Sequence, residues 1–277
     1  MNKKFAFNLT KIELNSKTPI SRIMSVNRPY RRTRRAFING SYTTIGANWQ
    51  YIEHPKYSTS PDQYIRSADL IRKDLVNLFD YVEPSDTNLK TFSFRIHELL
   101  LRACVEVEAN CKAILVENGY QKDPDNFHMK HDYFKIQSSH LLSDFEVKLP
   151  IWHGTPRLWK PFSNWNTTTY KKLPWYDSYN KSKHDRLNHF SDANFENLLG
   201  AVTGLAVLIS AQFGKITFES GPLFLTMGNS SRDGMDDTVL DYFRVKYPTN
   251  WAQNERYDFD WQILSANSND PFSDYPY

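Results

Sequence analysis

The stretch that decides the fold is SDANFENLLGAVTGLAVLISAQFG, residues 191–214. Nearly every residue from Leu198 to Ile209 is apolar or glycine, so a helix built from them has no polar side. We predict a helix over residues 191–213, capped by Ser191 and ended by Gly214. A helix that is apolar all round is buried inside a protein. We therefore expect this helix at the centre of a helical bundle.

Four other stretches show helical spacing of their apolar residues. The first opens at Pro61, a residue suited to the first turn of a helix, and is stopped by Pro84. The longest spans residues 91–118 and ends before Gly119, which we expect to be its C-cap glycine. Two more helices are predicted, over residues 133–142 and 173–188.

These helices predict a mainly α fold, with a four- or five-helix bundle over residues 61–213. We expect residues 1–60 to form a basic arm of short strands and loops. Residues 214–277 are predicted to form a β-hairpin and an acidic, aromatic tail. Small hairpins are expected at both ends of the chain, one turning at Asn39-Gly40 and one around residues 220–222.

The composition is that of a water-soluble globular protein. Hydrophobic residues make up 40% of the 277 residues and the mean hydropathy is -0.61, which argues against a membrane protein and a disordered chain. The longest apolar run, around residues 205–211, is too short to span a bilayer. Cys104 and Cys111 are seven residues apart on one predicted helix, too far for a disulfide. We expect free thiols, no membrane contact and a cytoplasmic location.

The charges are unevenly distributed along the chain, although the formal net charge is only +3. Residues 1–35 hold ten basic residues against one acidic residue, and residues 232–277 hold four basic against nine acidic. The arm and the tail are therefore expected to pair, within one subunit or between two. The alternative is that the arginine run of residues 31–35 contacts a phosphate backbone.

The segment richest in chemistry is WYDSYNKSKHDR, residues 175–186. On a helix, three of its side chains stack one turn apart: Tyr176, Asn180 and His184. A histidine can exchange a proton near neutral pH, and Lys183 and Arg186 can stabilise charge on a phosphoryl group. The pattern therefore favours phosphodiester chemistry. The competing interpretation is a polar helix face with one structural histidine.

The stretch Tyr179-Asn180-x-x-Lys183-His184-x-Arg186, followed by an Ala/Leu-rich helix, resembles the higher eukaryote and prokaryote nucleotide-binding (HEPN) superfamily. Its members are helical bundles, and many are metal-independent RNases of toxin–antitoxin, abortive-infection and other defence systems. Asn180 and His184 match the family's Asn and His positions. Tyr179 stands where the family has an arginine, so the resemblance implies that Lys183, Arg186 or a partner supplies the missing cation.

The resemblance implies a metal-independent endoribonuclease that attacks with the ribose 2′-hydroxyl. His184 would be the general acid or base, Asn180 would orient it, and Lys183 and Arg186 would stabilise the phosphate. No cofactor and no metal are implied. The expected partners are RNA (tRNA or mRNA), an antitoxin or defence-system protein, and a second copy of the chain. The alternative is a non-catalytic bundle that binds a nucleotide, RNA or a protein.

Further side chains are assigned to the site from the neighbouring segments. Glu98 or Glu106 would hold a cation or the imidazole, and both are also expected to form salt bridges with Arg102, at i, i+4 spacing. The aromatic and basic loop of residues 152–172 could stack single-stranded bases, or could simply close the bundle. We therefore predict six substrate-binding residues: Tyr179, Tyr176, Arg102, Lys171, Lys172 and Trp159.

Other chemistries have weaker support. His128 and His131 could share a helix face as metal ligands, but no third ligand follows at a suitable spacing. The sequence also lacks a glycine-rich phosphate loop and a Gly-x-Ser-x-Gly nucleophile elbow.

Overall fold

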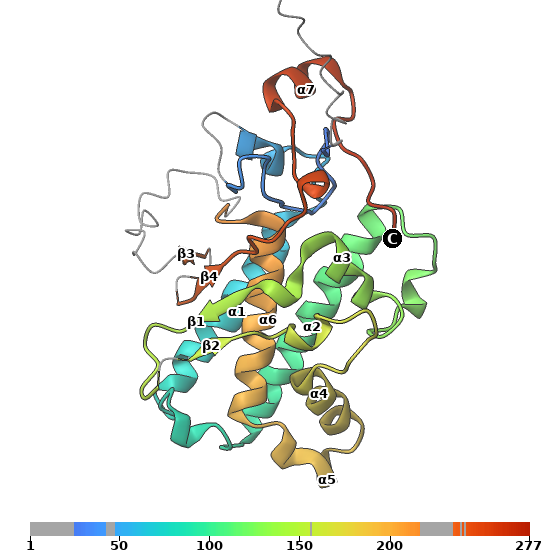
Figure 1. Ribbon diagram of the computed structural model, residues 1–277. Helices are drawn as coiled ribbons and strands as arrows, with labels where there is room; N and C mark the ends of the chain where they lie inside the picture. The colour runs from blue at the N-terminus through green and yellow to red at the C-terminus, as the bar shows by residue number, and fades with distance from the viewer. Residues whose placement is uncertain (1–24, 43–47, 156, 217–234, 239, 241) are drawn as a thin grey trace, which may run out of the picture.

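The computed structural model shows a mainly α protein in which four helices form a bundle (Figure 1). These helices are α1 (Pro61–Phe79), α2 (Phe94–Glu117), α4 (Pro174–His184) and α6 (Phe195–Phe213). Helix α6 packs against the other three. The structure describes residues 25–42, 48–155, 157–216, 235–238, 240 and 242–277.

Helix α6 is the buried centre that the sequence predicts, and Leu205 and Leu208 are completely inaccessible to solvent. It begins later than predicted, because Asn194 and not Ser191 caps it: the Asn194 side chain accepts a hydrogen bond of 3.1 Å from the backbone N–H of Asn197. Among the described residues, it is the only helix long and apolar enough to cross a membrane. Most of it is covered by the bundle, as in the core helix of a globular domain.

Helix α2 has defined caps at both ends. The Ser93 hydroxyl accepts a hydrogen bond from the N–H of Ile96 at its start. At its end Gly119 adopts a φ of 70°, and the N–H of Tyr120 bonds to the Leu115 carbonyl, which completes a Schellman motif. The predicted role of Gly119 is therefore confirmed. The two cysteines of α2 are free and buried, as expected.

The helix predicted over residues 173–188 is broken in two. Helix α4 ends at His184, and a short helix, α5 (Arg186–His189), follows after Asp185. The Asp185 carboxylate accepts hydrogen bonds from the backbone and the side chain of Asn188, so it caps α5. Arg186 therefore belongs to a separate helix, and it does not continue a stripe of α4.

The remaining bundle segments are short. Helix α1 begins at Pro61, as predicted, and α3 (Ile136–His140) lies inside the predicted range of residues 133–142. A small antiparallel sheet has the order β2-β1-β4-β3, which the sequence analysis did not foresee. Its strands are β1 (Glu146–Lys148), β2 (Leu158–Trp159), β3 (Asp236–Asp237) and β4 (Arg244–Lys246).

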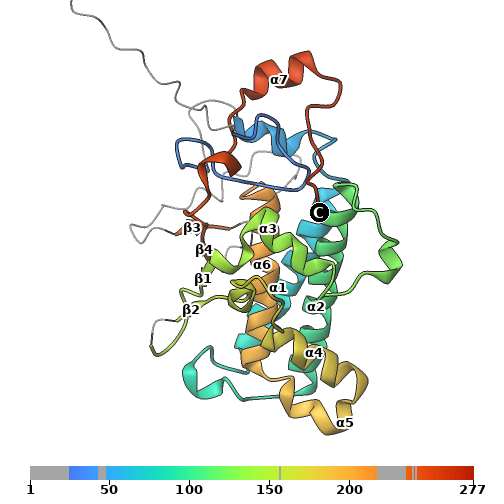
Figure 2. The ribbon, with the colours of Figure 1, turned by 45° about the vertical axis from the view of Figure 1, so that its right-hand side comes forward.

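The described parts of the arm and the tail pack together at the end of the bundle opposite α5, where α7 (Trp261–Asn267) lies (Figures 1 and 2). The predicted turn at Asn39-Gly40 forms, with a Gly40 φ of 79°. Most of the strand predicted to follow this turn lies outside the described residues, and the strand before it is bridged at Phe37 to Tyr257 of the tail. Most of the second predicted hairpin, around residues 220–222, lies outside the described residues.

The arginine run of residues 31–35 joins the arm to the rest of the protein. Arg31 forms ion pairs with Asp270, at 2.6 Å, and with Asp274. Pairing of the arm and the tail within one subunit is therefore what the structure shows. Arg32 and Arg35 are buried, which removes them from any contact with a phosphate backbone.

The two buried arginines have different surroundings. Arg32 is 2.8 Å from Glu117 and donates a hydrogen bond of 2.9 Å to Gln212. Arg35 donates to the backbone carbonyls of Ser139 and Glu255. Its guanidinium also lies over three aromatic rings, those of Tyr30, Trp251 and Tyr275. The arginines thus hold the arm in place from inside the protein.

Candidate functional site

Helix α4 carries the candidate site and is held against the bundle by one face. Trp175, Ser178, Tyr179 and Ser182 are the buried residues of this helix. The Trp175 indole donates a hydrogen bond of 2.8 Å to the carbonyl of Pro161. A Cβ atom at Gly200 of α6 would lie 2.9 Å from the Trp175 ring, so only glycine permits this close packing. The rotation of α4 about its axis is therefore fixed.

This rotation turns the predicted catalytic side chains outward. Asn180 is half-buried, whereas Lys183 and His184 are exposed at the C-terminal end of α4. Arg186 is exposed on α5, two residues after His184. Lys183, His184 and Arg186 therefore lie at the junction of α4 and α5, at the end of the bundle opposite α7 (Figure 2). A substrate or a second copy of the chain can reach them there.

Tyr179 was predicted to bind substrate, and its position contradicts this. The side chain is only 1% exposed, and its hydroxyl accepts a hydrogen bond of 3.1 Å from Nζ of Lys183. The Lys183 ammonium also lies 5.1 Å from the centre of the Tyr179 ring. The hydrogen bond that Lys183 donates to Tyr179 raises the pKa of Lys183. Tyr179 therefore positions a cation and is itself out of reach of a substrate.

Tyr176 is also turned toward the bundle. It is half-buried, and its hydroxyl donates a hydrogen bond of 2.6 Å to the carboxylate of Glu108 on α2. Burial and this carboxylate together raise the pKa of Tyr176. The bond ties α4 to α2, so a substrate-binding role for Tyr176 is not supported by its geometry.

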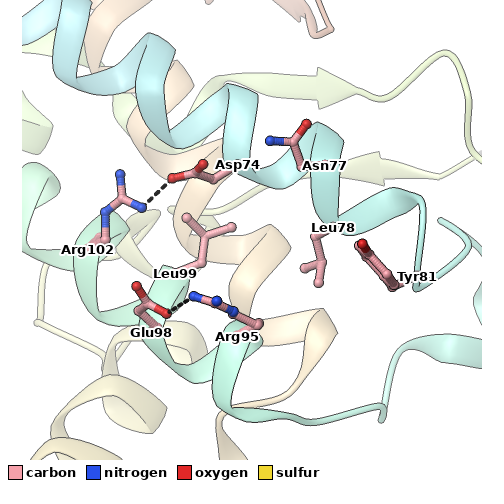
Figure 3. A pocket seen from close by; sticks show the side chains of 8 residues that line it. All are labelled: Asp74, Asn77, Leu78, Tyr81, Arg95, Glu98, Leu99 and Arg102. Carbon is pink, nitrogen blue, oxygen red and sulfur yellow. Dashed lines mark hydrogen bonds and ion pairs between the residues drawn. The ribbon is translucent and has the colours of Figure 1, made fainter.

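The glutamate of α2 that contacts α4 is Glu108, and not Glu98 or Glu106, which were predicted to serve the site. Glu98 pairs with Arg95 at 3.0 Å, and Arg102 pairs with Asp74 of α1 (Figure 3). The salt bridge expected between Glu98 and Arg102 therefore does not form. These side chains line a pocket of about 440 Å³ between α1 and α2. Glu106 lines a second groove between the same two helices. The three residues therefore lie on the α1 side of α2 and not beside His184.

His97 is a second residue of α2 that the sequence analysis missed. It is buried, and the centre of its ring lies 5.9 Å from that of Phe190, the residue that follows α5. Burial lowers the pKa of His97, and the Arg186 cation lowers it further. The helical spacing could have revealed both residues, because His97, Cys104 and Glu108 share one stripe of α2.

The other predicted substrate-binding residues lie on the opposite flank of α4 or in its approach loop. Trp159 is buried beneath Arg157, whose guanidinium lies 4.2 Å from the ring centre. It lines a groove of about 680 Å³ together with Lys181 and other residues of α4 and α6. Lys171 and Lys172 are exposed before the start of α4. The structure does not bring Trp159 together with His184.

The cations of this region differ in whether a carboxylate neutralises them. Lys172 and Lys181 both pair with Asp177, and together they lower the pKa of that carboxyl. Lys90 and Arg157 both pair with Glu196. In contrast, within the described parts of the chain, three side chains at the end of α4 form no ion pair with a carboxylate: Lys183, His184 and Arg186.

This unpaired group is the feature that sets the end of α4 apart. A cation that no carboxylate neutralises remains available to a phosphate, and the exposed His184 can exchange a proton beside it. No three His, Cys, Asp or Glu side chains of the described residues gather closely enough to hold a metal ion. The chemistry that this end of the helix can perform is therefore anion binding with proton transfer.

No family model, curated protein or solved structure matches this chain. The resemblance to the HEPN superfamily rests on the motif and on the order of the helices, and it stays a prediction.

Proposed function

We propose that this protein is a metal-independent endoribonuclease whose site lies at the C-terminal end of α4. The observation that carries the proposal is the exposed group of Lys183, His184 and Arg186, none of which is neutralised by a carboxylate of the described residues. Proton transfer and charge stabilisation are the two things that cleavage of a phosphodiester requires. Both kinds of group stand here on neighbouring turns.

The proposed reaction is an intramolecular phosphoryl transfer within the RNA. The ribose 2′-oxygen attacks the adjacent phosphorus, and the bond from phosphorus to the 5′-oxygen of the next nucleotide breaks. The products are a 2′,3′-cyclic phosphate and a free 5′-hydroxyl. His184 takes the proton of the 2′-hydroxyl, and the imidazolium so formed donates a proton to the leaving 5′-oxygen. Lys183 and Arg186 stabilise the charge that develops on the phosphate oxygens. Asn180, one turn before His184, orients the imidazole.

The biological setting proposed follows from the HEPN resemblance. It is the cytoplasm of a prokaryote, where such an RNase acts in defence or as a toxin and where tRNA or mRNA is the substrate. A second copy of the chain would place two His184 residues at one cleft, in an isologous dimer. Burial of Tyr179 at the family's arginine position favours one alternative, a bundle that binds RNA or a nucleotide without cleaving it.

Incubation of the purified protein with total RNA, with and without EDTA, tests the proposal. We expect cleavage that survives EDTA and products that end in a 2′,3′-cyclic phosphate. The matched control is Lys73→Ala, because Lys73 is an exposed lysine of α1 that pairs with Asp69 and lies outside the proposed site. This variant should cleave as the wild type does. RNA that stays intact while the protein binds it would support the non-catalytic alternative.

A further inference from the structure

An aromatic and aliphatic surface lies beside the candidate site, formed by the start of α2 and by α5. Three large apolar side chains are exposed there: Phe92 (47%), Phe94 (64%) and Leu187 (91%). Exposed apolar side chains that gather at one place mark binding surfaces more often than scattered ones do. We call this group the aromatic end surface.

Two rings of the aromatic end surface, those of Phe92 and Phe94, pack against the ring of Phe190. The Phe94 ring lies 4.7 Å from that of Phe190, and the Phe92 ring lies 5.5 Å from the same partner. Phe94 is the first residue of α2, directly after the Ser93 cap, and Phe92 bridges to Asn194 at the start of α6. Rings fixed in this way lose little conformational entropy when a ligand covers them.

Arg186 connects this surface to the candidate site. Its guanidinium lies 5.3 Å from the centre of the Phe94 ring, and the residue follows His184 by two positions. Since no carboxylate of the described residues pairs with Arg186, its charge is available to an anionic ligand. An exposed ring thus lies against a cation that no carboxylate of the described residues neutralises, and this cation follows His184 by two positions in the chain. A nucleotide offers the matching groups, which are a base, a phosphate and a ribose hydroxyl.

We propose that Phe94 is a nucleobase-binding subsite, on which one base of a single-stranded RNA stacks while its phosphate contacts Arg186. This inference rests on the proposed function, because it names the form of RNA that the same site takes. Stacking on an aromatic side chain accepts any base, since every base has a π-face. A duplex cannot use the subsite, because its bases are already stacked on one another. The protein should therefore select unpaired RNA with little sequence preference at this position.

The test measures binding without cleavage. A fluorescently labelled single-stranded 2′-O-methyl oligonucleotide lacks the attacking hydroxyl, so its dissociation constant reports recognition alone. We expect Phe94→Ala to weaken binding by about 5- to 150-fold, the range that loss of one stacked base gives. The control is Ile263→Ala on α7, at the other end of the bundle, because Ile263 is 63% exposed, nearly as much as Phe94. This control should bind as the wild type does, and the same sequence as a duplex should bind weakly to all three proteins.

The outcomes separate this proposal from the nuclease proposal. If the wild type binds the oligonucleotide through Phe94 but cleaves no RNA, the subsite stands and the nuclease activity is refuted. Equal affinity of Phe94→Ala and the wild type, or no binding of single strands by the wild type, would overturn the subsite. Sedimentation of the wild type and of Phe94→Ala tests whether a second copy of the chain occupies the surface instead. A wild-type dimer that Phe94→Ala converts to a monomer would assign the surface to that second copy and overturn the proposal.

Discussion

Lys183 donates a hydrogen bond of 3.1 Å to the hydroxyl of Tyr179, one helical turn earlier on α4. Tyr179 is thus buried and holds a neighbouring cation at the surface. This arrangement places a positive charge one residue before His184 on α4. It also changes what substitution of Tyr179 should do.

Tyr179→Arg should destabilise the protein, although the HEPN motif would suggest that it restores activity. Its side chain is 1% exposed, so the new guanidinium would be buried next to Lys183. An unpaired buried charge costs several kcal/mol, and a neighbouring like charge adds to that cost. Urea unfolding of the variant and of Tyr179→Phe, which keeps the ring, measures the effect. A Tyr179→Arg protein as stable as the wild type and more active would show that this position faces the substrate.

Leu205→Asp should prevent folding, because Leu205 is completely buried in the central helix. An unpaired carboxylate there costs several kcal/mol, a large part of the stability of a domain. The control is Leu187→Asp, at a leucine that is 91% exposed, and it should change the free energy of unfolding by less than about 0.5 kcal/mol. Circular dichroism and thermal unfolding of both variants provide the comparison. A cooperatively folded Leu205→Asp protein would contradict the bundle.

Arg32→Gln should lower the free energy of unfolding by about 3–5 kcal/mol, because it removes one partner of a buried ion pair with Glu117. The exposed Arg28 provides the control, and Arg28→Gln should have almost no effect on stability. Denaturant unfolding distinguishes the two. The salt dependence of RNA binding by the folded Arg32→Gln protein should match that of the wild type. A slope reduced by about 0.7 would instead indicate a lost phosphate contact.

Stability should fall as the pH drops from about 6.5 toward 4. Burial lowers the pKa of His140 to about 4, and the ring is held between the Ser139 hydroxyl and the Arg32 carbonyl. The unfolded chain therefore binds a proton at a higher pH than the folded protein does, and protonation favours unfolding. His140 alone can change the free energy of unfolding by at most about 1.4 kcal/mol per pH unit.

Urea unfolding between pH 7.5 and 4.5 measures this dependence, and His140→Gln isolates the contribution of His140. The buried His97 has a lowered pKa as well, so part of the dependence should remain in the variant. If His140→Gln and the wild type lose stability in parallel over this range, His140 is not the titrating group.

The central helix and the caps of α2 could be predicted from the sequence, because a helix apolar all round and a C-cap glycine are local signals. The break at Asp185 could not. A short polar side chain either stays inside a helix or caps the next one, and the choice depends on tertiary packing. The burial of two arginines of the arm could not be predicted for a similar reason. Arginines are usually exposed, and only contacts with distant segments account for their burial: Glu117 and Gln212 for Arg32, and the tail for Arg35.

The candidate site was predictable in its position along the chain but not in its surroundings. Asn180, Lys183 and His184 lie on the outer side or end of one helix, as the spacing indicates. The carboxylate that faces α4 was assigned to the wrong stripe of α2, because both stripes carry glutamates and the apolar face between them is wide. Tyrosine has an apolar ring and a polar tip, so its sequence context does not reveal whether it points inward, as Tyr179 does.

Cleavage of RNA by His184→Ala, compared with the wild type in the presence of EDTA, tests the central claim most directly. The substitution removes the proton-transfer group and leaves Lys183 and Arg186 in place. We predict that the cleavage rate falls by about 10²–10⁴-fold while the affinity for a 2′-O-methyl oligonucleotide changes little. A His184→Ala protein that cleaves RNA at the wild-type rate would contradict the account, as would a wild-type protein that cleaves no RNA.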